Sequence, residues 1–190
     1  MKIAFALGAA LLTCSAAMAG TVNYTGALTN ADPTWNRPVA NGNLPPVSPP
    51  SGVGTAVHYD VQPFFVSAAG SYTFFSTGTN PVGWDNYTFL YQDSFNPLSQ
   101  FTNVLIGNDD GPNFTIGESG FTINLVTGKN YFFVTTAFGN TDIGNYSNNI
   151  TGTGEITLGT IRTGVPEPGS LALFGLALAG LAATQRRKSA

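Results

Sequence analysis

The sequence contains little cysteine, histidine or charge. Its 190 residues include one Cys, one His and 9% charged residues, about a third of the charge of an ordinary soluble protein. A zinc site built from Cys and His and a disulfide within the chain are therefore excluded, because each needs more of these residues. The single cysteine, Cys14, lies near the start, so the body of the chain also lacks a Cys-His catalytic pair.

Positive charge is especially scarce between Gly20 and Gly164. This stretch holds three positive residues against nine negative ones. Such a composition cannot neutralise a run of phosphates, so we expect no nucleic-acid partner.

Residues 1–19 are typical of a secretory signal peptide. Lys2 precedes an apolar stretch from Ile3 to Leu12, and small residues follow. This stretch, which we expect to be a helix, is too short to cross a bilayer core of ~30 Å. Since Ala17 and Ala19 form an A-x-A site, we expect signal peptidase to cleave between Ala19 and Gly20.

The alternative for this segment is a lipoprotein signal ending at Cys14. Its sequence would be Leu-Leu-Thr-Cys, with Thr13 where such signals usually have Gly or Ala. If the segment is a signal peptide, Cys14 is removed and the mature chain contains no cysteine, which suits an oxidising or extracellular setting.

Residues 165–190 combine three further features. Pro166-Glu167-Pro168 interrupts regular structure, residues 170–183 are uncharged and mostly apolar, and a basic tail follows with Arg186, Arg187 and Lys188. The apolar stretch predicts a transmembrane helix of roughly 21 Å whose basic tail stays in the cytoplasm. The alternative, a buried helix of the core, is disfavoured because the stretch has no polar face.

The order of these three features closely resembles the PEP-CTERM sorting signal of Gram-negative bacteria. The resemblance implies that the tail holds the protein in the inner membrane until an exosortase recognises Pro166, Glu167 and Pro168 and cleaves there. It also implies an association with exopolysaccharide production and a final place on the cell surface or in the extracellular matrix. The activity of the domain ahead of the signal is not implied.

Residues 20–54 predict an N-terminal strand followed by a proline-rich arm. Val22, Tyr24 and Leu28 lie on one side of an extended chain. Six prolines between residues 31 and 53 exclude a helix, so we expect irregular chain there.

Residues 55–164 predict an all-β domain, an antiparallel, jelly-roll-like β-sandwich. Runs rich in aromatic and β-branched residues alternate with turn formers, and 21 of the 23 aromatic residues lie between residues 20 and 164. About 145 residues can bury enough surface for a core without disulfides or metal. The expected strands are 57–61, 71–77, 86–92, 103–106, 121–125, 130–138 and 154–158.

A second resemblance concerns residues 55–158. The segments DNYTFLY at 85–91, NDDG at 108–111, YFFV at 131–134 and GNY at 144–146 look like those of bacterial pre-peptidase C-terminal domains. The resemblance implies a non-catalytic, jelly-roll-like module of a secreted protein, of which some relatives bind calcium or polymeric ligands.

Asp109 and Asp110, with Asn108 and Glu118 nearby, are the main candidate for a binding site. Carboxylate and amide oxygens are what calcium requires, usually six to eight of them. The spacing does not fit an EF-hand loop, and Asp-Gly is also a common hairpin turn in which the carboxylate bonds the local backbone. Both interpretations stay open, and no other cofactor is expected.

Trp84 is the candidate for a glycan contact, since an aromatic ring can stack on a sugar. Large aromatic residues of a sandwich are more often core, so this interpretation has a structural alternative. A hydrolase is disfavoured because His58, expected to be exposed beside Asp60, is the single imidazole and no G-x-S-x-G elbow occurs. Paired carboxylates for glycoside hydrolysis depend on separations that a sequence does not give.

Together these features predict a secreted, surface-sorted β-sandwich protein without catalytic activity. Its expected partners are signal peptidase, exosortase, the membrane through residues 170–183, and exopolysaccharide of a biofilm matrix or cell envelope. The main alternative is a carbohydrate-binding or adhesin module, with calcium as an additional ligand.

Overall fold

The computed structural model describes residues 19–42, 45–46, 49–111 and 115–161. The body is built of β-strands, and one short 3-10 helix, Pro97–Ser99, lies between two of them. The strands are β1 (Gly20–Leu28), β2 (Thr34–Trp35), β3 (Val57–Val66), β4 (Gly70–Asn80), β5 (Asn86–Gln92), β6 (Val104–Asn108), β7 (Glu118–Leu125), β8 (Tyr131–Ala137), β9 (Gly144–Gly152) and β10 (Ile156–Leu158).

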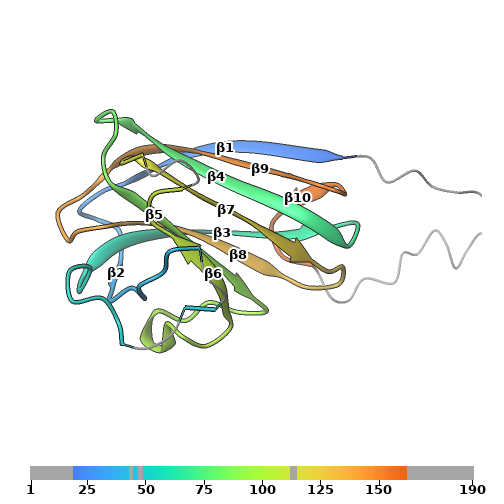
Figure 1. Cartoon of the computed structure of the whole chain (residues 1–190), viewed down its shortest axis with the longest axis horizontal. Coiled ribbons are helices and arrows are strands. Elements are labelled where there is room, and N and C mark those ends of the chain that lie inside the picture. Colours follow the sequence, from blue (N-terminus) through green and yellow to red (C-terminus); the bar gives the residue numbers. More distant parts are fainter. Residues whose placement is uncertain (1–18, 43–44, 47–48, 112–114, 162–190) are drawn as a thin grey trace, which may run out of the picture. The chain divides into compact units, whose positions relative to one another are not determined.

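The strands form two antiparallel sheets (Figure 1). One has four strands in the order β1-β9-β4-β7. The other has six, with the order β10-β3-β8-β5-β6 and β2 paired to β3. The sheets pack face to face, since Phe74 of β4 lies with its ring centroid 5.1 Å from that of Phe133 in β8. The predicted all-β antiparallel sandwich is therefore confirmed.

Aromatic side chains fill the space between the sheets. The ring of Phe74 contacts those of Phe64, Phe121 and Phe133, and Phe64 stacks on Tyr131. Phe121 is 8% exposed, and each of the other rings is at most 1% exposed. Such rings supply most of the apolar area that stabilises the sandwich.

The proline-rich arm covers the outer face of the six-stranded sheet. Trp35 of β2 packs its ring against Phe89, Tyr91 and Phe95 and donates a hydrogen bond from Nε1 to the Thr136 hydroxyl, 3.0 Å away. The arm is otherwise without regular structure where it is described, as its prolines predict. Strand β5 is consequently buried on both faces, between the arm and the other sheet.

One central strand differs from the sequence prediction. Strand β9 runs between β1 and β4, yet residues 144–152 were not among the expected strands. Its inward positions are Tyr146, Asn148, Ile150 and Gly152, of which only two are large and apolar. The polar Asn148 is accommodated because its side-chain amide donates to the Thr135 hydroxyl at 2.8 Å. The apolar alternation of the sequence was therefore too sparse to reveal this strand.

The predicted signal helix at residues 1–19 and the predicted transmembrane helix at residues 170–183 fall outside the described part of the chain, except for Ala19. Within that part, no helix is both long and apolar enough to cross a membrane. The domain boundaries expected at residues 19, 54 and 164 stay predictions. Strand β1 nevertheless pairs with β9 along its whole length, which makes it part of the sandwich.

The aromatic core yields a stability prediction. Replacing Phe133 by Ala leaves a cavity beside Phe74 and Phe121, and we expect a loss of about 3–5 kcal/mol in the free energy of unfolding. Urea unfolding followed by tryptophan fluorescence measures this. The control Leu98→Ala removes a side chain that is 90% exposed and should change stability by about 0.5 kcal/mol or less. Equal unfolding midpoints for the two variants would contradict the assignment of Phe133 to the core.

Candidate functional site

A pocket of about 480 Å³ lies where the arm meets the end of strand β6. The arm forms one wall, and its Gly42 donates a backbone hydrogen bond to the Gly107 carbonyl of β6 at 2.8 Å. Strand β5 and the residue after β8 complete the pocket. Its lining comprises Arg37, Val39, Ala40, Asn41, Ser51, Gly52, Val53, Tyr87, Asn108, Asp109, Asp110 and Phe138.

Arg37 is a buried cation in the lining of this pocket, with 2% of its surface exposed. Its guanidinium donates to the carbonyl oxygens of Pro38, Ala137 and Phe138, at 3.1, 3.0 and 2.8 Å. Its Cζ lies 4.1 Å from the centre of the Tyr87 ring, a cation–π contact. Burial lowers the pKa of Arg37, while nearby acidic groups oppose that shift. Arg37 therefore contributes one buried positive group to the pocket, and backbone carbonyls hold it in place.

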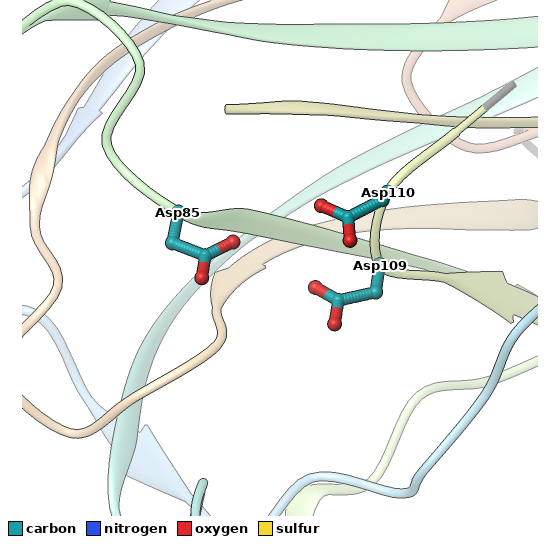
Figure 2. Close-up of side chains that lie close together, drawn as sticks. All are labelled: Asp85, Asp109 and Asp110. Atoms are coloured by element: carbon teal, nitrogen blue, oxygen red, sulfur yellow. The ribbon is translucent and has the colours of Figure 1, made fainter. Parts of the chain in front are cut away.

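The carboxylates of Asp85, Asp109 and Asp110 lie close together (Figure 2), and Asp109 and Asp110 also line the pocket. Asp85 directly precedes β5, and Asp109 and Asp110 directly follow β6. Since β5 and β6 are antiparallel neighbours with Thr88 opposite Asn108, the start of one strand meets the end of the other. One carboxylate oxygen from each Asp lies within 4.8 Å of those of the other two.

The carboxylates of this acidic trio (Asp85, Asp109 and Asp110) are partly withdrawn from water. Each residue is half-buried, and one oxygen of Asp85 and one of Asp109 are buried without a hydrogen-bond partner in the described part of the chain. Burial, reinforced by Asp85 and Asp110, raises the pKa of Asp109 to about 7, and Arg37 opposes the shift. Burial and the acidic neighbours also raise the pKa of Asp85. Ionising these carboxylates is unfavourable because they are partly buried and repel one another, and a bound cation would reduce that free-energy cost.

The four residues that the sequence singled out for calcium have different positions. Asp109 and Asp110 belong to the acidic trio, and Asp85 joins them in place of Glu118, which starts β7. The Asn108 side chain instead stabilises the turn after β6. It donates a hydrogen bond to the Gly120 carbonyl at 2.7 Å and accepts one from the Asp109 backbone N–H at 3.0 Å. Asp85 was missed because only the strand pairing brings it near Asp109.

Trp84 is buried, with 6% of its surface exposed, and its Nε1 donates to the Asn145 carbonyl at 2.6 Å. Its ring therefore offers no free face on which a sugar could stack, contrary to the glycan-contact interpretation. His58 also differs from its predicted exposure, because it is half-buried and its Nδ1 lies 2.8 Å from the Asp32 carbonyl oxygen.

The residues of the sorting signal lie outside the described part of the chain. These are Pro166, Glu167, Pro168, Arg186, Arg187 and Lys188. At the predicted signal cleavage site, Ala17 is likewise outside, while Gly20 begins β1.

The raised pKa of Asp109 predicts a pH dependence. Asp109 has an ordinary pKa of 3.8 when unfolded and a pKa of about 7 when folded, so between pH 3.8 and pH 7 the folded protein binds more protons than the unfolded chain. The contribution of Asp109 to the free energy of unfolding is therefore most favourable at low pH and is lost as the pH rises towards 7. We expect the melting temperature in a chelating buffer to fall between pH 5 and pH 8, and Asp109→Asn to reduce that fall. Asp93→Asn is the control, because Asp93 is exposed and its pKa is lowered, mainly by its hydrogen bond with Lys129. The same fall in wild type and Asp109→Asn would contradict this prediction.

Three solved structures show a distant likeness to this chain. A family 35 carbohydrate-binding module from an environmental isolate is 15% identical with a TM-score of 0.36, over 73% of this chain and 99% of that one. The CBM35 from Cellvibrio japonicus Abf62 is 16% identical with a TM-score of 0.33, over 73% and 100%. A chain of the cowpea mosaic virus top component is 12% identical with a TM-score of 0.32, over 81% and 93%. Similarities this low carry no information on function.

Comparison with protein families concerns the other end of the chain. No curated protein matches the sequence. Residues 164–188 match the family described as the PEP-CTERM protein-sorting motif. This motif implies export, transit anchored in the membrane and processing by an exosortase. The pre-peptidase resemblance of residues 55–158 stays a prediction. The chain is thus a β-sandwich protein that carries a PEP-CTERM protein-sorting motif at residues 164–188.

Proposed function

We propose that the protein is an exosortase substrate whose β-sandwich serves as a non-catalytic structural or adhesive component outside the cell. Signal peptidase removes residues 1–19, and the helix of residues 170–183 anchors the chain in the inner membrane. Exosortase then cleaves at Pro166-Glu167-Pro168 and releases the body to the cell surface or the exopolysaccharide matrix. The sorting motif at residues 164–188 is the observation that carries this proposal.

The position of the motif relative to the strands supports release of an intact domain. The last described strand, β10, ends at Leu158, and the aromatic core of the described residues lies ahead of it. Cleavage at Pro166–Pro168 therefore leaves every described strand in the released body.

The outer face of the four-stranded sheet supports a role beside neutral polymers. Thr21, Thr151, Thr73 and Thr122 are successive partners across its four strands, and the hydroxyls of Thr73 and Thr122 lie 2.9 Å apart. Asn, Ser and further Thr residues occupy most of the other outward positions, among which Glu118 is the only charged residue. Hydroxyl and amide groups can exchange hydrogen bonds with polysaccharide hydroxyls without ionic attraction.

The sorting step is tested by replacing Pro166, Glu167 and Pro168 together with Ala. We expect this variant to stay in the membrane fraction, whereas wild type appears in the surface or medium fraction with a shorter chain by mass spectrometry. The control replaces Pro49 and Pro50 of the arm with Ala, which alters two prolines and leaves the motif intact. Equal release and equal mass of wild type and the motif variant would contradict processing at this motif.

Calcium binding by the acidic trio is a second function that a specific observation favours. Two carboxylate oxygens there are buried without a hydrogen-bond partner among the described residues, and calcium is bound by carboxylate oxygens. Three carboxylates supply part of the usual six to eight ligands, and water or a ligand hydroxyl would supply the others.

The calcium proposal predicts that millimolar calcium raises the melting temperature of the protein at pH 8. Asp109→Ala and Asp85→Ala should each abolish the rise, because each removes a carboxylate from the trio. Glu118→Ala should retain it, since Glu118 is not part of the trio. The measurement is a thermal melt with calcium, magnesium or chelator. No rise in wild type, or the same rise in all variants, would exclude a calcium site here.

A further inference from the structure

Strand β1 is an edge strand, bonded to a neighbour on one side only. Its nine residues pair with β9 in an unbroken antiparallel register, from Gly20 opposite Gly152 to Leu28 opposite Gly144. It lies at one side of the four-stranded sheet, with β7 at the other (Figure 1). An edge strand presents a row of backbone groups that can pair with another chain.

The registers show which β1 groups face outward. On the other edge, the carbonyls of Glu118 and Gly120 in β7 accept hydrogen bonds from the Gly111 N–H and the Asn108 side chain, so these residues face away from β4. Residues of an antiparallel strand alternate between its two neighbours. The registers extend this alternation from β7 through β4 and β9 to β1. They place the backbone N–H and C=O groups of four β1 residues on the free side, namely Thr21, Asn23, Thr25 and Ala27.

These four residues offer four N–H and four C=O groups in one continuous row. Strand β1 pairs with β9 alone, and no other backbone hydrogen bond reaches these groups from a described residue. Their side chains alternate with the inward ones and are all exposed. The whole strand contains no charged residue, no proline and no irregularity of register, which are the features that usually protect an edge.

The other edges of the sandwich are short or covered. Strand β10 has three residues and β2 has two. Strand β6 has five, with a register shift against β5, and Gly42 of the arm donates to it. On β7 the outward carbonyls of Glu118 and Gly120 are already bonded. Among these described edges, β1 alone is both long and free to pair with another strand.

We infer that β1 is a self-association surface that takes the β1 strand of a second copy of this chain. Two β1 strands pair antiparallel about a two-fold axis through Tyr24, with Thr21 opposite Ala27 and Asn23 opposite Thr25. Every outward N–H then meets an outward C=O of the other copy, so all eight groups are satisfied on each strand. The two four-stranded sheets become one continuous sheet of eight strands.

The second copy fits this edge better than other occupants. The β1 row is self-complementary under a two-fold axis, which closes the assembly as a dimer. On β7 of another copy, only Thr122 and Asn124 would offer both outward groups to β1, because the carbonyls of Glu118 and Gly120 and the Glu118 N–H already have partners. No charge on β1 repels an identical strand, although the body as a whole is acidic.

This inference does not rest on the sorting motif or on calcium. Association through β1 requires only the folded sandwich, so failure of exosortase processing leaves it unaffected. Since backbone pairing of one strand buries little surface, we expect a reversible dimer whose formation depends on protein concentration.

The experiment compares two matched proline variants of the full chain in mild detergent. Thr25→Pro removes an N–H that faces the free side of β1, and proline fits an edge strand at such a position. Thr122→Pro does the same at β7. We expect sedimentation velocity to show dimers for wild type and Thr122→Pro, and a dissociation constant raised about ten-fold or more for Thr25→Pro. Far-UV circular dichroism and melting curves verify that both variants fold.

Hydrogen exchange gives an independent measurement on wild type without substitution. The amides of Thr21, Asn23, Thr25 and Ala27 should exchange more slowly as the protein concentration rises, while that of Thr122 should not change. A wild-type monomer at all concentrations, or unchanged exchange in β1, would overturn the inference. Loss of association in both proline variants would also overturn the inference, because that result would indicate pairing of β1 with β7.

If Thr25→Pro fails to fold, the double variant Asn23→Lys with Thr25→Lys replaces it. The corresponding control is Thr73→Lys on the central strand β4.

Discussion

Strand β5 is buried on both faces, and this burial positions the arm and the start of the strand. Six of its seven residues are buried. Phe89 and its neighbours Tyr87 and Tyr91 pack under the arm, whereas Leu90 belongs to the core between the sheets. A shift of one residue would exchange the two faces, so the aromatic packing holds β5 in a single register. That register determines where the strand begins, and with it the position of Asp85.

The candidate site is a direct consequence of this register. The strand start brings Asp85 to Asp109 and Asp110, and the arm that covers β5 brings Arg37 over the Tyr87 ring. A chain with only 9% charged residues thus places Arg37, Asp109 and Asp110 in the lining of one pocket, with Asp85 next to the two carboxylates. Burial raises the pKa of Asp109 and lowers that of Arg37, so it disfavours the charged form of each. The Tyr87 ring and backbone carbonyls are the contacts that position Arg37.

Away from this site, the scarcity of charge has a different effect. The outer face of the four-stranded sheet consists mostly of hydroxyl and amide side chains, and its edge strand β1 has no charge at all. Charged edges keep soluble β-proteins apart, and this protein lacks that protection along its longest free edge. The neutral polar face is consistent with the proposed place beside polysaccharides, and the open edge with the proposed pairing of two copies.

Local patterns in the sequence were sufficient for the sorting motif, the irregular arm and most strands, because each depends on residues close together in the chain. The strand at 86–92 was predicted with its bounds, whereas β9 was missed because Asn148 and Gly152 replace apolar residues at its inward positions. The sequence also singled out Asp109 and Asp110, but it could not place Asp85 beside them or bury Trp84. Those arrangements, and the freedom of the β1 edge, were decided only by the tertiary structure, because pairing between strands remote in the sequence sets which side chains meet and which backbone groups stay unpaired.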